Sequence, residues 1–161
     1  MLRLKMYPGK NGDAFLVDAS GSNILIDAGY ASTFKEFIAP DLVQLCKAGG
    51  RLDLLICTHI DADHIGGVIE FISSNGVSGA RRIIEIDEVW HNSLRSLPTP
   101  PGSSDLVSDR LLLEAIQRRG FLLPEAIESV AKPISVRQGS SLAKLLKQHG
   151  YLWNSGDGTA C

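Results

Sequence analysis

The feature that most constrains this chain of 161 residues is a group of metal-binding side chains set between a strand and a helix. Residues 58–67 read THIDADHIGG, and four potential ligands fall within six positions: His59, Asp61, Asp63 and His64. The apolar run 52–57 before them is typical of a buried strand, and residues 68–73 after them predict a helix. We therefore expect the ligands on a loop at the carboxyl end of a strand, where open α/β sheets place their sites.

The spacing of these four side chains divides them into two pairs. His59 and Asp61 are two residues apart, so in extended backbone both side chains point the same way and can face one metal ion. Asp63 and His64 are adjacent at the turn into the helix, point elsewhere, and suit a second ion. Imidazole and carboxylate together favour zinc, manganese or iron over calcium, which prefers oxygen ligands alone. The alternative is that the four are ordinary polar residues of a surface turn.

Composition and charge narrow the class of protein. The hydrophobic fraction of 44% is ordinary for a globular domain with a core. A net charge of −2 argues against a broad basic surface that binds nucleic acid by charge alone, but a bound metal could still supply positive charge to a phosphodiester site. Three cysteines without a CxxC pair predict free thiols in a reducing compartment. With neither a signal peptide nor an apolar run of about 18 residues, we expect a cytoplasmic protein without a membrane span.

The order of the predicted elements indicates one α/β domain over residues 1–161. Strand patterns come first, at residues 2–7 (half-buried), 14–19 and 24–26. A helix is expected to begin at Thr33, where Glu36 completes a capping box, to be broken or kinked at Pro40, and to end at the glycines 49–50. Further along, a parallel strand is expected at 88–90 and helices at 105–119, 124–130 and 141–148. Antiparallel strands followed by strand–helix alternation are typical of an α/β layered sandwich.

The ligand loop resembles the signature of the metallo-β-lactamase-fold hydrolase superfamily, His-x-His-x-Asp-His followed by small residues. Residues 59–67 match it, with Asp61 where the second His usually stands. This variant is similar to the soluble domain of competence-type DNA-uptake proteins, and residues 11–15 (NGDAF) and 24–29 (ILIDAG) match as well. The resemblance is specific over residues 1–92 and faint over 93–161. It implies an αββα sandwich of which this chain holds the first half and somewhat more.

The same resemblance implies that the chain is truncated, because the family takes its remaining ligands from later strands. After His64 the sequence offers only His91 and His149, without a late Asp–His pair. His91 follows a strand expected beside the ligand strand, which makes it the best candidate for a third ligand. The alternative is an ordinary loop histidine beneath Trp90. His149 stands at a helix carboxyl end, where the helix dipole explains it.

Two further residues are expected to support the site rather than to bind metal. Asp27 ends a strand before a glycine, and the family places there a carboxylate that supports the ligands through hydrogen bonds. Such support is common, since a metal-bound His usually donates its other nitrogen to a carboxylate or carbonyl. Asn92 is a candidate hydrogen-bond donor to substrate. A plain turn former is the alternative for Asp27.

The resemblance implies a metal-dependent hydrolase in which a metal-bound hydroxide attacks the substrate. We expect one or two zinc ions, with manganese as an alternative because Asp61 puts oxygen where nitrogen is usual. Asp63 is assigned as both a ligand and a catalytic residue. The variant favours a phosphodiester substrate, either a small molecule such as a nucleotide or a nucleic acid. A thiol ester or β-lactam is less favoured, since relatives acting on these usually keep His at position 61.

A second hypothesis places the chain in another class, a catalytically incomplete binding or interaction module on the same fold. The short length and the missing late ligands favour it. Half of a sandwich exposes apolar surface, which invites a homodimer or a partner chain that completes the fold.

Overall fold

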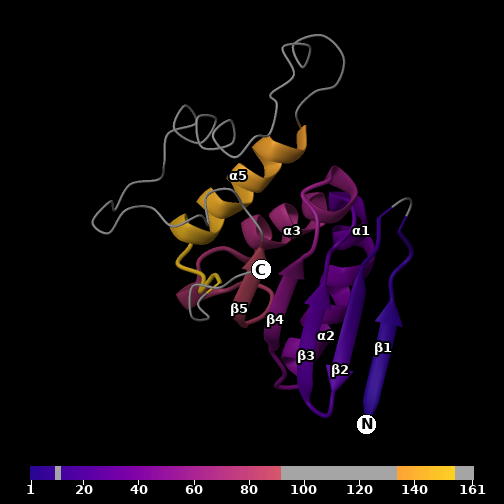
Figure 1. Ribbon diagram of the computed structural model, residues 1–161. Helices are drawn as coiled ribbons and strands as arrows, with labels where there is room; N and C mark the ends of the chain where they lie inside the picture. The colour runs from indigo at the N-terminus through magenta and orange to yellow at the C-terminus, as the bar shows by residue number, and fades with distance from the viewer. Residues whose placement is uncertain (10–11, 92–133, 155–161) are drawn as a thin grey trace, which may run out of the picture.

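The computed structural model of this chain describes residues 1–9, 12–91 and 134–154 (Figure 1). Five strands form one sheet in the order β1-β2-β3-β4-β5. They are β1 (Leu2–Met6), β2 (Phe15–Ala19), β3 (Ser22–Ile26), β4 (Leu52–Cys57) and β5 (Ile86–His91). The first three strands are an antiparallel meander, and β3, β4 and β5 run parallel. This order confirms the predicted α/β organisation, with antiparallel strands before parallel ones.

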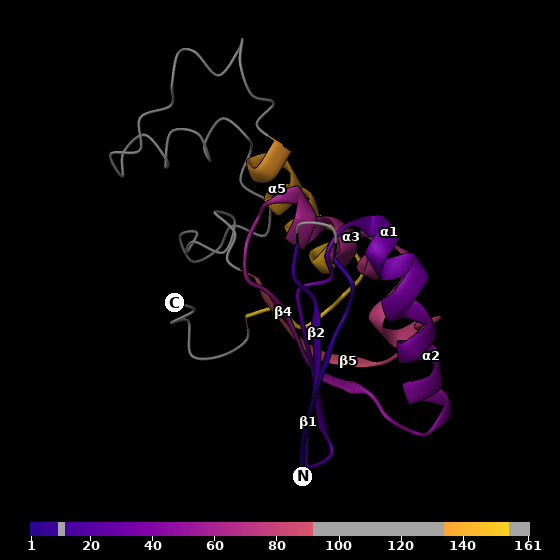
Figure 2. The ribbon, with the colours of Figure 1, turned by 90° about the vertical axis from the view of Figure 1, so that its right-hand side faces the viewer.

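Helices cover one face of the sheet, as the edge-on view in Figure 2 shows for α1, α2 and α3. The helical segments are α1 (Ala31–Thr33), the π-helical turn η1 (Phe34–Ile38), α2 (Ala39–Lys47), α3 (Ala62–Asn75), the 3-10 turn η2 (Ser78–Ala80) and α5 (Ile134–Gln148). α5 packs against α3. The helices predicted at 105–119 and 124–130 lie outside the described residues. Within the described ranges, no helix combines the length and the apolar character that crossing a bilayer requires.

The helical region after β3 differs from the prediction at its start. α1 begins at Ala31 and its N-terminal cap, Tyr30, makes no side-chain capping bond, so the capping box expected at Thr33 is wrong. Nor does Pro40 break the helix. It follows the π-helical turn and occupies the start of α2, where the missing N–H of proline costs little. α3 and α5 also begin earlier than predicted, at Ala62 and Ile134.

The core lies between the sheet and these helices. Leu25, Leu55 and Val89 stand side by side in β3, β4 and β5, and all three are fully buried beneath the helices. From the helical layer, Phe34 stacks on Phe71 with 5.0 Å between ring centroids. Each of these side chains stabilises the fold by roughly 1.5–3 kcal/mol relative to an exposed position.

A close contact between α3 and the end of β3 positions the loop that precedes the helix. The N–H of Gly67 donates to the carbonyl oxygen of Gly29 at 2.7 Å. A Cβ at position 67 would lie 2.0 Å from the carbonyl oxygen of Ala28, so only glycine fits there without displacement of backbone. Gly12 also packs closely against the first turn of α3, since a Cβ at position 12 would lie 1.7 Å from the carbonyl oxygen of Asp63. The first turn of α3 is therefore held between two backbone segments.

The fully buried amide of Asn75 fixes the other end of α3. Its Oδ1 accepts the N–H groups of Ile83 and Ile84 at 2.9 and 3.0 Å, and its Nδ2 donates to the carbonyl of Ile84 at 2.9 Å and to the Tyr151 hydroxyl at 2.8 Å. Tyr151 in turn donates to the carbonyl of Gly76 at 2.9 Å. This network joins α3, the segment leading into β5 and the chain after α5.

No described helix covers the sheet face opposite α1, α2 and α3 (Figure 2). β1 was expected to be half-buried, but every residue in it is exposed. The reason is that β1 lies at the edge of the sheet. Leu2, Leu4 and Met6 are 73%, 65% and 69% exposed. Cross-strand partners share a face, so the register continues this surface from Leu4 to the neighbouring strands. Its central row is Leu4, Val17, Ile24 and Leu54, and the row ends at the charged residue Glu88 in β5.

Candidate metal centre

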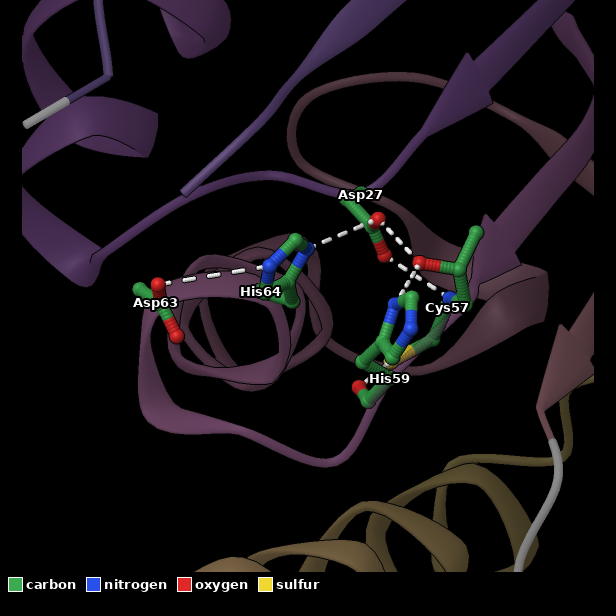
Figure 3. A network of polar contacts seen from close by, with 6 residues as sticks. Asp27, Cys57, His59, Asp63 and His64 are labelled. Carbon is green, nitrogen blue, oxygen red and sulfur yellow. Dashed lines mark hydrogen bonds and ion pairs between the residues drawn. The ribbon is translucent and has the colours of Figure 1, made fainter. Parts of the chain in front are cut away.

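The candidate site lies where β3 and β4 end and α3 begins (Figure 3). Asp27 directly follows β3, and its N–H donates to the carbonyl of Ile56 in β4 at 2.8 Å. Its backbone is left-handed, with φ of +54°, a conformation that Asp tolerates better than most residues. Because of this turn in the chain, the side chain of Asp27 lies between the two strand ends instead of continuing along β3.

The Asp27 carboxylate is buried, with 3% of the residue exposed, and three donors surround it. Its Oδ1 accepts the N–H of Thr58 at 2.8 Å. Its Oδ2 accepts a short bond from the Thr58 hydroxyl and lies 3.0 Å from Nδ1 of His64. A buried carboxylate is costly unless such donors satisfy it, and here they come from Thr58, directly after β4, and from His64 in α3. The contact between Asp27 and His64 is the geometry that a supporting carboxylate requires.

His59 and His64 approach each other beside this carboxylate, with 5.0 Å between their ring centroids. Each of the two imidazoles and Asp27 offers one ligand atom, and these atoms lie within 4.8 Å of one another. His59 is exposed and His64 is partly buried, so the group opens toward solvent. Two nitrogens and a carboxylate oxygen are a donor set that zinc and other divalent transition metals accept. The residues therefore fit a divalent metal ion.

Asp61 and Asp63 flank this group without joining it. Asp61 occupies the N-terminal cap position of α3 in extended backbone, is exposed, and makes no side-chain capping bond. Asp63 lies in the first turn, with its Oδ2 4.0 Å from Nε2 of His64, so that the His64 ring stands between Asp63 and Asp27 (Figure 3). The sequence paired His59 with Asp61. In the structure, His59 approaches His64 and Asp27. The ligand roles of both aspartates stay predictions.

His91 ends β5, opposite Cys57 in the parallel register, so the predicted neighbouring strand is confirmed. The residue is 2% exposed and its ring stacks on Trp153 at 6.3 Å between centroids, while Trp90, the expected cover, is half-exposed. The N–H of His91 donates to Oδ1 of Asn154 at 3.0 Å. The structure does not bring His91 into the group of Asp27, His59 and His64. Its ligand role stays a prediction, and Asn92 lies outside the described residues.

Cys57, which immediately precedes the loop, is buried and donates through Sγ to the carbonyl of His59 at 3.2 Å. Burial, and after it the negative charge of Asp27, raises the pKa of the Cys57 thiol far above its usual range. In the metal-free chain, the residue is thus a protonated thiol. Sequence reasoning missed Thr58, whose side chain contacts both Asp27 and His59. The only sequence signal for it was a hydroxyl residue directly before the first histidine.

Comparisons with known proteins matched this chain to one family model and to solved structures. The family model described as the Metallo-beta-lactamase superfamily matches residues 7–136. Among solved structures, the chain is similar to a Thermotoga maritima protein described as a "putative metallo-beta-lactamase", with 11% identity, a TM-score of 0.38, and coverage of 94% of this chain and 57% of that one. It is also similar to the hydrolase AbOPH of the beta lactamase superfamily, with 22% identity, a TM-score of 0.34, and coverage of 90% and 43%.

The chain thus spans about half the length of these two solved proteins. A search of curated proteins gave no match. The family model covers most of the chain, from the end of β1 past the ligand loop and β5. On that match, this chain belongs to the metallo-beta-lactamase superfamily.

Proposed function

We propose that this chain carries the first part of the metal centre of a hydrolase that acts on a phosphodiester. The observation that supports it most is the convergence of Asp27 and His59, which follow β3 and β4, with His64 in the first turn of α3. Membership of the superfamily supports a hydrolytic reaction. The substrate is proposed from the motif, since Asp61 stands where the resemblance expects His in relatives that act on thiol esters and β-lactams.

In this proposal His59, Asp61, Asp63 and His64 hold one or two divalent ions, zinc first and manganese as the alternative. A bound ion would lower the pKa of a water toward 7 and polarise the substrate's phosphoryl oxygen. The exposed Asp61 carboxylate makes no bond to the helix, which leaves it accessible to an ion. Its oxygen, in place of nitrogen, is the reason that manganese is a credible occupant.

The chain's own residues orient these ligands and carry charge. The buried Asp27 carboxylate holds the His64 ring through Nδ1. Asp63, on the other side of that ring, is acidic and lies in the first turn of α3, where the helix dipole stabilises a negative charge. A carboxylate at this position can bind an ion or accept a proton from water, which is the catalytic role we propose for Asp63. We also propose a cytoplasmic location, which the free thiols of Cys46 and Cys57 support.

Metal stoichiometry and hydrolysis together test this function. The full chain is purified without chelator, equilibrated with zinc or with manganese, and analysed by plasma mass spectrometry. We expect at least one ion per chain and its loss in His59→Ala and His64→Ala. His149→Ala, which changes a histidine far from the loop in sequence, is the matched control. Activity is then followed on bis(p-nitrophenyl) phosphate and on a short single-stranded DNA. A chain that binds no metal under either condition contradicts the proposal.

A second candidate, an interaction module without catalysis, is favoured by the apolar open face of the sheet. Four strands, β1 to β4, about 4.8 Å apart and about five residues long at about 3.3 Å each give an apolar face of roughly 300 Å². A patch of this size is comparable to the largest apolar patch on a typical monomer, and such patches are often interaction sites. The partner we propose for it is a second copy of this chain. Metal binding without turnover, together with a dimer in solution, is the result that separates this candidate from the hydrolase.

A further inference from the structure

The side chain of Thr58 occupies a central place in the contacts around the candidate metal centre. Thr58 is the first residue after β4 and directly precedes His59. Its N–H donates to Oδ1 of Asp27 at 2.8 Å. Its hydroxyl contacts two partners, Oδ2 of Asp27 through a short bond and Nδ1 of His59 at 2.7 Å. The hydroxyl is therefore the direct connection between a buried carboxylate and the exposed imidazole of His59.

The direction of these bonds follows from what each group can donate. A carboxylate has no proton to give, so the single hydrogen of the Thr58 hydroxyl points to Asp27. The hydroxyl oxygen then has only lone pairs left for His59. The bond at 2.7 Å consequently requires a hydrogen on Nδ1 of His59. The neutral His59 imidazole is therefore held as the Nδ1–H tautomer. This leaves the Nε2 lone pair to bind a metal ion.

His64 is also held as the Nδ1–H tautomer, in its case directly by Oδ2 of Asp27. Its Nδ1 lies 3.0 Å from Oδ2 of Asp27, which accepts only, so Nδ1 again carries the hydrogen. One carboxylate oxygen thus orients two histidines, His64 directly and His59 through the intervening hydroxyl. Figure 3 shows the two rings on different sides of Asp27. In both histidines, Nε2 is then the nitrogen whose lone pair can bind a metal ion.

We propose that Thr58 is a positioning residue that fixes the tautomer and ring orientation of His59 for metal binding. The inference rests on the proposed metal centre, and it assigns to Thr58 the part that Asp27 plays for His64. Residues that support metal-bound histidines in this way typically contribute 10–100-fold to metal affinity. Because the Thr58 hydroxyl acts on only one of the ligands, we expect the lower end of that range.

Two substitutions separate the hydroxyl from the shape of the side chain. Thr58→Val keeps the branched Cβ and removes the hydroxyl, whereas Thr58→Ser keeps the hydroxyl. The first readout is the tautomer of His59 in the metal-free full chain, from long-range ¹H–¹⁵N correlation spectra at a pH where imidazole is neutral. We expect the Nδ1–H form in wild type and Thr58→Ser, and a shift toward the Nε2–H form in Thr58→Val, with His64 unchanged.

The second readout is zinc affinity, measured by competition with a chromophoric chelator. We expect Thr58→Val to bind zinc roughly tenfold more weakly and Thr58→Ser to match wild type. An unchanged tautomer and unchanged affinity in Thr58→Val, with its unfolding temperature preserved, overturn the proposal. If wild type binds no zinc, the metal centre of the proposed function fails, and the tautomer measurement still decides whether Thr58 orients His59.

Discussion

Asp27 and His64 are 37 residues apart in the sequence, and Oδ2 of the carboxylate lies 3.0 Å from Nδ1 of the imidazole. The contact joins the end of β3 to the first turn of α3. It exists only because Asp27 adopts a left-handed backbone and because Gly67 lets α3 approach the backbone at Ala28. The orientation of a candidate ligand therefore depends on backbone geometry at two positions outside the ligand loop.

Substitution of Asp27 tests this dependence. Asp27→Asn keeps a side chain that tolerates left-handed backbone but replaces one accepting oxygen with a donor, which conflicts with the three donors around it. We expect zinc affinity to fall by about 10–100-fold and stability to fall by about 1–3 kcal/mol. The measurements are chelator competition and urea unfolding. Asp18→Asn, which changes an aspartate in the exposed hairpin, is the control and is expected to change neither.

Local sequence patterns predicted the strands well and the site geometry less well. Alternating apolar residues and turn residues are local signals, so all five strands could be predicted from the sequence, and β5 was expected beside β4. The start of α3 at Ala62 could not, because it depends on how Gly12 and Gly67 pack against neighbouring backbone. That start places His64 in the first turn of the helix, where its ring approaches His59 and Asp27.

The same reason explains two other differences between prediction and structure. The contribution of Thr58 arises from a bond to Asp27, 31 residues away, which no local spacing reveals. The π-helical turn before Pro40 likewise reflects packing, since it buries Phe34 against Phe71 of α3. Periodicity along the chain reports which residues are buried, but not which distant backbone they are buried against.

The two glycines of α3 are expected to respond to alanine in opposite directions. A Cβ at Gly67 would lie 2.0 Å from the carbonyl oxygen of Ala28, whereas the nearest atom to a Cβ at Gly66 is 3.8 Å away. Gly67→Ala should therefore lower stability by about 1–3 kcal/mol through overpacking and should weaken metal binding. Gly66→Ala should raise stability by up to about 1 kcal/mol through helix propensity. Urea unfolding of the two variants is the check, and equal effects would contradict the close contact at Gly67.

Removal of the Asn75 amide is expected to be the most destabilising of these substitutions. Asn75→Ala leaves the N–H groups of Ile83 and Ile84 without their acceptor in a buried place. Each unsatisfied buried group costs about 1–3 kcal/mol, so we expect a loss of at least about 2 kcal/mol in urea unfolding. Ser74→Ala, on the same helix, removes only a hydroxyl that donates to Glu70. That control is expected to cost less than about 1 kcal/mol, and a similar loss in both variants would contradict the role of the Asn75 network.

Alkaline pH is expected to destabilise the fold through Tyr7. Burial, and after it the hydrogen bond and negative charge of Asp41, raises the pKa of the Tyr7 hydroxyl well above its usual value of 10. Above pH 10 the unfolded chain therefore loses this proton while the folded chain keeps it, so stability must fall as pH rises. Its contribution is fully present below pH 10. Urea unfolding between pH 8 and 11.5 measures the slope, which we expect to be shallower in Tyr7→Phe. Identical slopes in both proteins would contradict the buried hydroxyl.

The open face of the sheet is expected to mediate association between copies of the chain. Leu4 lies on this face and is 65% exposed, so a lysine there remains solvated in a monomer but would be buried in a dimer that uses the face. Light scattering should show a concentration-dependent dimer in wild type and a monomer in Leu4→Lys. Val77→Lys, which places the same charge at a half-exposed residue between α3 and η2, is the matched control and should leave the dimer intact. A wild-type chain that stays monomeric at high concentration removes the interaction module as a candidate and leaves the metal centre unaffected, because Leu4 is not part of the group of Asp27, His59 and His64.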